Sequence, residues 1–490
     1  MLIRLIIFVL FFIPNLLFAY GSILFDDFFL DKTMRVDYYH IGNATDEMIT
    51  IDQIYEQGTW AGNPKRLLDP FNNGKYCVKV YDVASNQLIF SKGFNSYFGE
   101  YQTTDPAIAG KQRTFRETAL IPCPKYPIYF MIEKRDKTNM LSPLFSETID
   151  PAAISILREQ SASEVKVYEA IHHGTVHKNV DLAWIAEGYT ADQYDKFKAD
   201  VDRYVDVLFN VEPFKKHRKK FNVYGVFRAS DQSGVDEPRR GEFRNTALNA
   251  SFNALNLERY LLTEDTKSLH DIASAVPYDA IIIMVNMDRY GGGGIYNFYA
   301  ITTVHNIYSE NVFVHEFGHS FGGLADEYFS SSTSYNDFYP RGVEPTEPNI
   351  TAMLNPAHVK WQALLSPGID IPTDWSKSQY EALEDQRVAL RREKQEKVAD
   401  LTRGGAPDAE IDAVEKDYDK KYNDIVAQIK AFKQRQENLE TKVGAFEGAG
   451  YSAKGLYRPQ LDCMMFSNSD KKFCKVCENA LEKMILFYAD

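Results

Sequence analysis

The sequence predicts a mixed α/β protein with an antiparallel β-sandwich at its N-terminus, an α/β (α+β) domain behind it, and a helical hairpin inserted in that domain. Three observations support this fold class. Short runs of β-branched and aromatic residues fill the first third, strands alternate with helices after residue 180, and a charged segment rich in Glu, Lys, Gln, Arg and Ala occupies 378–443. A chain of 490 residues is also too long for one ordinary core.

The first residues have the layout of a signal peptide, which we place at 1–19. Arg4 supplies positive charge, residues 5–17 are almost unbroken in their apolar character, and Ala19 is a small residue at a plausible cleavage point. The apolar run is short for a membrane span, and we expect no membrane-spanning segment in the mature chain. The predicted location is therefore periplasmic, cell-surface or extracellular, with a retained N-terminal anchor as the alternative.

Composition and charge argue against a disordered chain and against a nucleic-acid-binding protein. Hydrophobic residues make up 44% of the chain and charged residues 25%, which are values of a globular protein rather than a disordered one. The formal net charge of -13 repels phosphate backbones. We therefore expect no nucleic acid among the partners.

Residues 20–151 are expected to form the β-sandwich domain. Gly, Asn, Asp and Pro separate its predicted strands, which are 76–83, 113–121 and 128–133. The segment contains no catalytic nucleophile, ligand cluster or phosphate-binding loop. A structural or substrate-presenting role is therefore the favoured interpretation.

Residues 152–179 are expected to be a linker, and 180–490 a second domain. Apolar residues at helical spacing predict a helix over 191–210, and the predicted strands are 180–186, 220–227, 280–285 and 299–303. The run from 281 to 285 is apolar on both faces, as expected for a buried central strand. The glycine-rich stretch 290–294 lacks the ending of a phosphate-binding loop, so a flexible turn is predicted there.

Within this second domain, 378–443 predicts two antiparallel helices. In its second half apolar residues recur at three- and four-residue steps, and the sequence Gly404 to Pro407 breaks the pattern in the middle. A solvated hairpin is the plainer interpretation. A docking arm for a partner is the alternative.

The sequence from His315 to Tyr328 carries the chemistry. His315 and His319 lie four residues apart, so on a helix both imidazoles share a face and can hold one metal ion. Glu316 sits one residue along, where it can contact a water on that ion without being a ligand. The pattern is typical of hydrolytic zinc sites, and we expect one catalytic Zn²⁺ ion.

Hydrolytic zinc needs a third protein ligand and an open position for water. Gly322, three residues past the second histidine, can adopt a left-handed turn and leave the helix. Such a turn brings a later carboxylate back towards the ion, and Asp326 and Glu327 are the candidates. The expected mechanism has zinc polarise the scissile carbonyl and acidify its water, while Glu316 takes the proton of that water.

The stretch from His315 to Tyr328 resembles the IgA-peptidase-type zinc metallopeptidases, a metzincin-like family also called igalysins. Segments at 181–190, 289–294 and 448–465 are similar to the same family, and the N-terminal region resembles its accessory domain. The resemblance implies a zincin/metzincin-like catalytic domain, secreted metalloendopeptidase activity and a protein or peptide substrate. It covers nearly all of the mature chain except 378–443.

The resemblance also implies a ligand set and a methionine turn. The common metzincin position of the third ligand falls on Ala325, which cannot bind metal, so Asp326 is the family-like substitute and Glu327 the alternative. A tight turn with a methionine beneath the metal is expected at 463–466. Met465 is predicted to be that methionine, with Met464 as the alternative, and its role is structural.

Five cysteines in an exported chain predict disulfides. One bridge is expected between Cys77 and Cys123, and a second among Cys463, Cys474 and Cys477, which leaves one thiol over. The spacing of Cys474 and Cys477 also matches half of a zinc knuckle. No second pair of this spacing completes four ligands, so the disulfide is preferred.

Together these observations predict a secreted zinc-dependent endopeptidase. Two other classes stay open, namely an inactive peptidase-like protein that serves in binding or adhesion, and a zinc hydrolase acting on a non-peptide amide. The intact set of His315, Glu316 and His319 argues against the inactive class, because loss of the glutamate is the simplest way to inactivate such a site.

Overall fold

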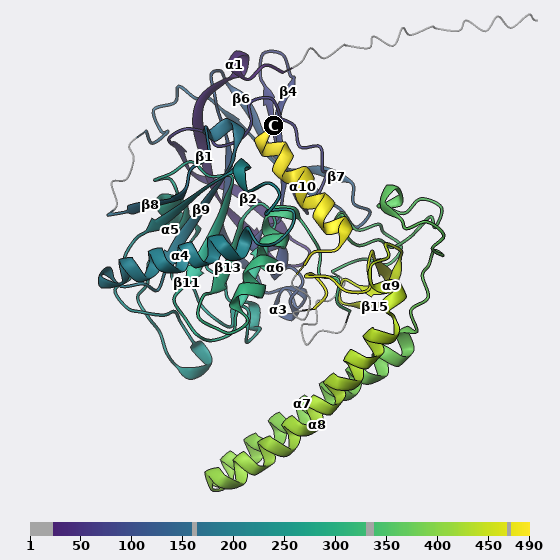
Figure 1. The fold of residues 1–490 in the computed structure, drawn as a ribbon. Coiled ribbons are helices and arrows are strands. Elements are labelled where there is room, and N and C mark those ends of the chain that lie inside the picture. The colour runs from purple at the N-terminus through teal and green to yellow at the C-terminus, as the bar shows by residue number, and fades with distance from the viewer. Residues whose placement is uncertain (1–22, 159–163, 330–337, 468–471) are drawn as a thin grey trace, which may run out of the picture.

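The computed structural model describes residues 23–158, 164–329, 338–467 and 472–490 (Figure 1). The signal peptide predicted at 1–19 lies outside the described residues. In the described ranges, no helix combines the length and the apolar character needed to cross a bilayer.

Two antiparallel sheets form the N-terminal part, as the sequence predicts. The strand orders are β2-β1-β5 and β4-β3-β6-β7. The strands are β1 (Phe29–Gly42), β2 (Glu47–Glu56), β3 (Tyr76–Asp82), β4 (Leu88–Phe94), β5 (Arg113–Pro124), β6 (Ile128–Arg135) and β7 (Leu141–Ile149). Side chains of both sheets, among them Val36, Val80 and Phe130, share one buried hydrophobic cluster. Three short helices accompany them, α1 (Phe25–Phe28), α2 (Tyr97–Tyr101) and α3 (Asp105–Ile108).

The second part is built on a six-stranded sheet of order β12-β13-β11-β9-β10-β8. The strands are β8 (Lys166–Ile171), β9 (Val180–Glu187), β10 (Phe221–Phe227), β11 (Ala280–Val285), β12 (Gly292–Ile295) and β13 (Tyr299–Thr303). The four inner strands are parallel, and both edge strands run antiparallel to their neighbours. Because β8 pairs with β10, that portion of the predicted linker 152–179 belongs to the sheet.

Edge strand β12 replaces the flexible turn that the glycines at 290–294 predict. A Cβ on Gly294 would lie 2.3 Å from the carbonyl oxygen of Glu316, so the strand can run against the helix that carries Glu316 only with glycine at this position. The absence of side chains on these glycines therefore serves close packing of the backbone and not flexibility.

Helices cover both faces of this sheet. Trp184 of β9 packs in the cluster with α4 (Tyr194–Leu208), α6 (Ser309–Gly322) and α10 (Lys475–Ala489), whereas its neighbour Ile185 packs in the cluster with α5 (Thr266–Ala273). Every residue of β9 is buried, as expected for a central strand with two covered faces. Short 3₁₀ turns lie at Val176–Lys178, Ala191–Gln193, Arg218–Lys220, Pro238–Arg240, Ala254–Asn256 and Gln362–Leu364.

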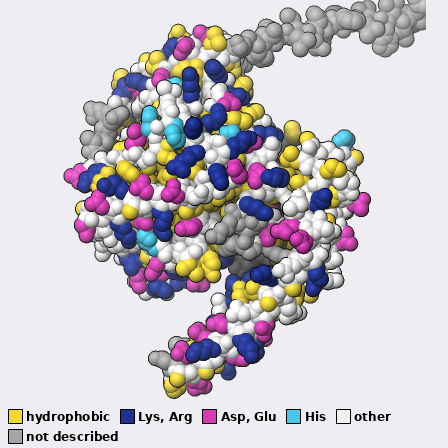
Figure 2. All heavy atoms as spheres, viewed as in Figure 1, with side chains coloured by type: hydrophobic (Ala, Val, Ile, Leu, Met, Phe, Trp, Pro, Cys, Tyr) yellow, Lys and Arg dark blue, Asp and Glu magenta, His cyan; other side chains and the backbone are white. Residues whose placement is uncertain are grey.

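The predicted helical hairpin is confirmed as α7 (Lys377–Arg403) and α8 (Asp408–Arg435), which project from the body of the protein (Figure 1). Trp375, Tyr380 and Phe432 pack at its base. Figure 2 shows acidic and basic side chains interspersed along the projecting part. The chain then returns through α9 (Glu437–Glu440), β14 (Phe446–Ala449) and β15 (Ser452–Arg458). Docking of a partner on the hairpin stays a prediction.

The prediction of two disulfides from the cysteine count is wrong, because all five cysteines are free and buried. Cys77 lies in β3 and Cys123 in β5, which are strands of different sheets. The Sγ atoms of Cys463 and Cys477 are 3.9 Å apart, well beyond the roughly 2.05 Å of a disulfide bond.

A buried arginine ties the N-terminal sheets to the second domain. The guanidinium of Arg35 in β1 donates two hydrogen bonds to Asp37, at 2.7 and 2.6 Å, and a third to Asp271 of α5 at 2.7 Å. Arg35 and Asp37 are both fully buried. Each charge would be costly to bury without an opposite charge, so Arg35 and Asp37 stabilise each other, and Arg116 pairs with Asp37 as well at 3.3 Å.

We therefore expect Arg35→Met to lower the free energy of unfolding in urea by about 3 kcal/mol, because Asp37 loses its bidentate partner in a buried position. Arg392→Met is the matched control, since Arg392 pairs with Glu396 on the exposed face of α7 and its loss should leave stability almost unchanged. Equal stability of the two variants would contradict this role of Arg35.

Candidate metal centre and active site

Helix α6 presents His315 and His319 on one side. Its opposite side packs into the core through Phe313, Phe317 and Phe321, which fixes the rotation of the helix. The two Nε2 atoms lie 3.1 Å apart, and the ring planes are inclined at 85°. The side chains of both histidines keep a small exposed fraction, 14% and 16%, so solvent reaches the pair.

The outer ring nitrogens decide the tautomer of both histidines. Nδ1 of His315 lies 3.0 Å from the carbonyl oxygen of Met464, and Nδ1 of His319 lies 2.6 Å from that of Leu324. A carbonyl oxygen only accepts hydrogen bonds, so both Nδ1 atoms donate. In the neutral rings, both Nε2 atoms therefore carry lone pairs, and these lone pairs point at the same place.

Asp326 completes the group. Its Oδ1 lies 3.0 Å from Nε2 of His315 and 3.3 Å from Nε2 of His319. This oxygen is buried and, apart from its contacts with the two histidines, has no hydrogen-bond partner among the described residues, while Oδ2 accepts a hydrogen bond from the hydroxyl of Tyr451. Two imidazole nitrogens and a carboxylate oxygen that converge in this way fit a zinc ion, for which they are the usual ligands.

The charges of the site favour a cation between these atoms. Burial alone would lower the pKa of His319, but the Asp326 carboxylate outweighs burial and raises it to about 9. Burial would likewise raise the pKa of Asp326, yet the two imidazoles hold it well below its usual range. Positive charge at this point, carried by protons or by a metal ion, therefore stabilises the buried carboxylate.

Glu316 lies beside the two histidines. Its carboxylate and the ring nitrogens of His315 and His319 fall within 4.8 Å of one another. Burial raises the pKa of Glu316 above its ordinary value, so this carboxylate takes up a proton more readily than an exposed one. Such a group is suited to act as a general base on a water held near the two histidines.

The chain leaves the helix one residue later than the sequence predicts. Gly322 is the last helical residue, and Gly323 takes the left-handed conformation with φ +60°. Gly322 is needed for another reason, since a Cβ there would lie 2.6 Å from Cδ2 of Leu481 in α10. The turn at Gly323 directs the chain back so that Asp326 reaches the histidines.

The alternative ligand, Glu327, is directed away from the histidines. Its Oε1 lies 3.1 Å from Sγ of Cys477 and 3.6 Å from Sγ of Cys474, and it accepts a hydrogen bond from Asn349. The structure thus brings together His315, His319 and Asp326, and it places Glu327 in a separate buried cluster. Successive residues of a chain that has left its helix project in different directions, which explains the separation.

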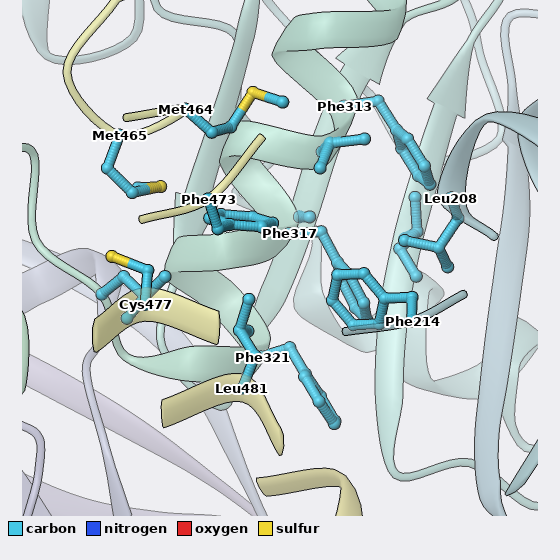
Figure 3. Packing of buried hydrophobic residues seen from close by; sticks show 14 of the residues in the cluster. Leu208, Phe214, Phe313, Phe317, Phe321, Met464, Met465, Phe473, Cys477 and Leu481 are labelled. Carbon is cyan, nitrogen blue, oxygen red and sulfur yellow. The ribbon is translucent and has the colours of Figure 1, made fainter. Parts of the chain in front are cut away.

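The predicted methionine turn lies beneath α6. The backbone N–H of Phe466 donates to the carbonyl of Cys463 at 2.9 Å, which closes a tight turn. Sδ of Met465 would lie 3.0 Å from a Cβ on Gly318, and Met464 supplies the carbonyl that holds His315. In Figure 3, Met464, Met465 and Phe473 lie on one side of α6, and Leu208 and Phe214 lie on the other.

Two residues near the site were not predicted from the sequence. Tyr451 holds Asp326, and it lies in the segment 448–465, so the family resemblance was the only signal for it. Glu100 comes from α2 in the N-terminal part, where it accepts a hydrogen bond from Tyr260, and loss of solvent raises its pKa to about 7. His319 and Glu316 act on it electrostatically, so the N-terminal sheets contribute to the surroundings of the site.

Two family profiles match the chain. The profile described as IgA Peptidase M64 matches residues 169–485, and the profile described as Peptidase M64 N-terminus matches residues 24–146. No curated protein matches the chain. The first match covers more than half of the sequence and contains both histidines, Glu316 and Asp326. The chain belongs to the peptidase M64 (IgA peptidase) family and is a metallopeptidase.

Proposed function

We propose that this metallopeptidase is an exported zinc endopeptidase that cuts proteins or peptides with Glu316 as its general base. The observation that carries the proposal is the convergence of two imidazole Nε2 atoms and one buried carboxylate oxygen within 3.0 to 3.3 Å. Three acceptors at this separation repel one another unless a cation lies between them. A hydrolytic site with three protein ligands leaves a fourth position for water.

In this proposal His315, His319 and Asp326 are the zinc ligands. When bound, zinc polarises the scissile carbonyl and makes the attacking water more acidic. The hydrogen bonds from the Nδ1 atoms to the carbonyls of Met464 and Leu324 orient the two rings and keep Nε2 free for the ion. Tyr451 orients the carboxylate of Asp326 in the same way.

Glu316 moves the proton. Its carboxylate takes a proton from the attacking water and later delivers it to the leaving amine, so no covalent enzyme intermediate is needed. The pKa raised by burial suits both steps, because the group accepts the proton readily and holds it until the amine leaves. The imidazoles of His315 and His319 act in the opposite direction and lower the pKa of Glu316, so they offset part of the effect of burial.

The proposal extends to the organisation of the chain. A signal peptide at 1–19 directs export, the N-terminal sheets over 20–151 act as a structural or substrate-presenting module, and 180–490 is a metzincin-like catalytic domain with the hairpin at 378–443 as an insertion. The methionine turn under α6 supports the metzincin-like assignment. The electrostatic effect of His319 on Glu100 supports a role of the N-terminal part near the substrate.

We expect Glu316→Gln to retain zinc and to lose peptidase activity, with kcat/KM on an unfolded protein substrate reduced by about 10²- to 10⁴-fold. Glutamine keeps the size of the side chain but cannot take up the proton. Glu310→Gln, an exposed position on the same helix, is the control and should keep full activity. Unchanged kcat/KM in Glu316→Gln with bound zinc would remove this residue from the mechanism.

We expect Tyr451→Phe to weaken zinc binding by about 10- to 100-fold, because the hydrogen bond that orients Asp326 is lost while the ring remains. Competition against a zinc-chelating dye measures the affinity. Tyr129→Phe on strand β6, far from the metal site along the chain, serves as the control. An affinity equal to that of the wild type would show that the hydroxyl of Tyr451 does not support the ligand.

Removal of the metal by dialysis against a chelator should abolish activity, and added Zn²⁺ should restore it while Mg²⁺ should not. Zinc must displace protons from His315 and His319, whose pKa values are raised, that of His319 to about 9. The protonated rings prevail below those values, so zinc affinity should rise with pH up to about 9. Full activity in the chelated protein, or affinity independent of pH, would count against these ligands.

A further inference from the structure

A second group of metal-ligating side chains lies outside the site described above. Glu327, Cys463, Cys474 and Cys477 each direct one ligand atom to a common point, and these four atoms fall within 4.8 Å of one another. They come from three parts of the chain, namely the segment after α6, the methionine turn, and the start of α10. Their exposed fractions are 0%, 0%, 3% and 0%, so the cluster is closed to solvent.

The spacing of the four atoms fits a tetrahedral zinc site. Zinc–sulfur bonds of about 2.3 Å and zinc–oxygen bonds of about 2.0 Å place neighbouring sulfurs about 3.8 Å apart and sulfur about 3.5 Å from oxygen. The measured separations are 3.9 Å between Cys463 and Cys477, and 3.6 and 3.1 Å from the sulfurs of Cys474 and Cys477 to Oε1 of Glu327. The sulfurs are too far apart for a disulfide bond.

Backbone groups around the cluster are directed at its sulfur atoms. The backbone N–H of Cys474 donates to Sγ of Cys463 at 3.1 Å, and that of Cys477 donates to Sγ of Cys474 at 3.4 Å. Cys474 is the N-cap of α10, where the helix dipole stabilises negative charge. The guanidinium of Arg458 is fully buried nearby, and its positive charge interacts favourably with the carboxylate of Glu327. Three thiolates and a carboxylate carry more negative charge than one divalent ion compensates, and these groups offset part of the remainder.

Glu327 itself indicates a missing partner. Its Oε1 accepts a hydrogen bond from Asn349 at 3.0 Å, but Oε2 is buried without a hydrogen-bond partner in the part of the chain that the structure describes. A fully buried carboxylate that faces three sulfur atoms is costly unless a cation compensates its charge. The cost is removed if the carboxylate is the fourth ligand of a metal ion.

We propose that Glu327, Cys463, Cys474 and Cys477 bind a second zinc ion, which is structural and distinct from the ion held by His315, His319 and Asp326. Four protein ligands fill a tetrahedral coordination sphere and leave no position for water, which is the arrangement of structural rather than catalytic zinc. Cys474 and Cys477 supply the two-residue spacing of a zinc knuckle, and the other two ligands come from distant parts of the chain.

The proposed second ion would lie beside the segments that support the ligands of the first. Glu327 follows the catalytic ligand Asp326 directly, and its backbone N–H donates to the carbonyl of Met465 at 2.8 Å. Cys463 begins the turn whose next residue, Met464, holds His315. Cys477 and Leu481 lie on α10, which packs against α6 (Figure 3). The ion would therefore fasten together the three segments that support the catalytic ligands.

Metal analysis of the purified full chain tests the proposal. We expect two zinc ions per chain in the wild type, one in His319→Ala and one in Cys477→Ser. Cys123→Ser is the matched control, since Cys123 is a buried cysteine in β5 outside the cluster, and it should keep two. A single zinc in the wild type that His319→Ala loses entirely would overturn the proposal, as would two zinc ions retained by Cys477→Ser.

A spectroscopic measurement decides the question even if Cys477→Ser fails to fold. Co²⁺ exchanged into His319→Ala should give the ligand-to-metal charge-transfer band of cobalt thiolate in the near ultraviolet and the visible bands of tetrahedral cobalt. This readout does not depend on peptidase activity, so it separates failure of the second site from failure of the catalytic one. The absence of a thiolate band, or a native mass that shows a disulfide among these cysteines, would overturn the proposal.

Discussion

The arrangement of the molecule depends on one electrostatic constraint, the meeting of two imidazole lone pairs and a carboxylate oxygen at a single point. Helical periodicity brings His315 and His319 to one side of α6, and two backbone carbonyls force their Nδ1 atoms to donate. Asp326 then approaches both Nε2 atoms to within 3.0 and 3.3 Å. Such a convergence of acceptors is unfavourable by itself, and positive charge between them, carried by protons or by a metal ion, stabilises it.

The remaining elements hold this point in place. Phe313, Phe317 and Phe321 fix the helix in the core, and the left-handed turn at Gly323 returns the chain towards the histidines. The methionine turn comes from more than a hundred residues later in the sequence, after the hairpin of α7 and α8 (Figure 1). The hairpin leaves and re-enters the domain at its packed base, so an insertion of this length does not disturb the methionine turn under α6.

Much of the fold and of the site follows from local patterns in the sequence. Alternating and β-branched runs predicted the strands, and a break at Gly404 to Pro407 between two charged helical stretches predicted the hairpin. Spacing alone selected His315 and His319, because side chains four residues apart share one face of a helix. Spacing could not decide between Asp326 and Glu327, since the direction of each side chain after the helix depends on the turn at Gly323.

What the sequence did not predict depends on contacts between distant segments. The cysteines were expected to pair, but Cys463, Cys474 and Cys477 face Glu327, which lies far from them in the chain. The glycines of β12 look like a flexible turn until the backbone of α6 is known to pass beside them. Tyr451 and Glu100 reach the site only through the tertiary fold; the family resemblance was the only signal for Tyr451, and no pattern in the sequence marks Glu100.

The most direct test of the central claim is anomalous diffraction at the zinc absorption edge from crystals of the purified protein. We expect an anomalous peak within bonding distance of Nε2 of His315, Nε2 of His319 and Oδ1 of Asp326. The absence of a peak at this point in zinc-containing crystals, or a peak whose third ligand comes from another residue, would contradict the account.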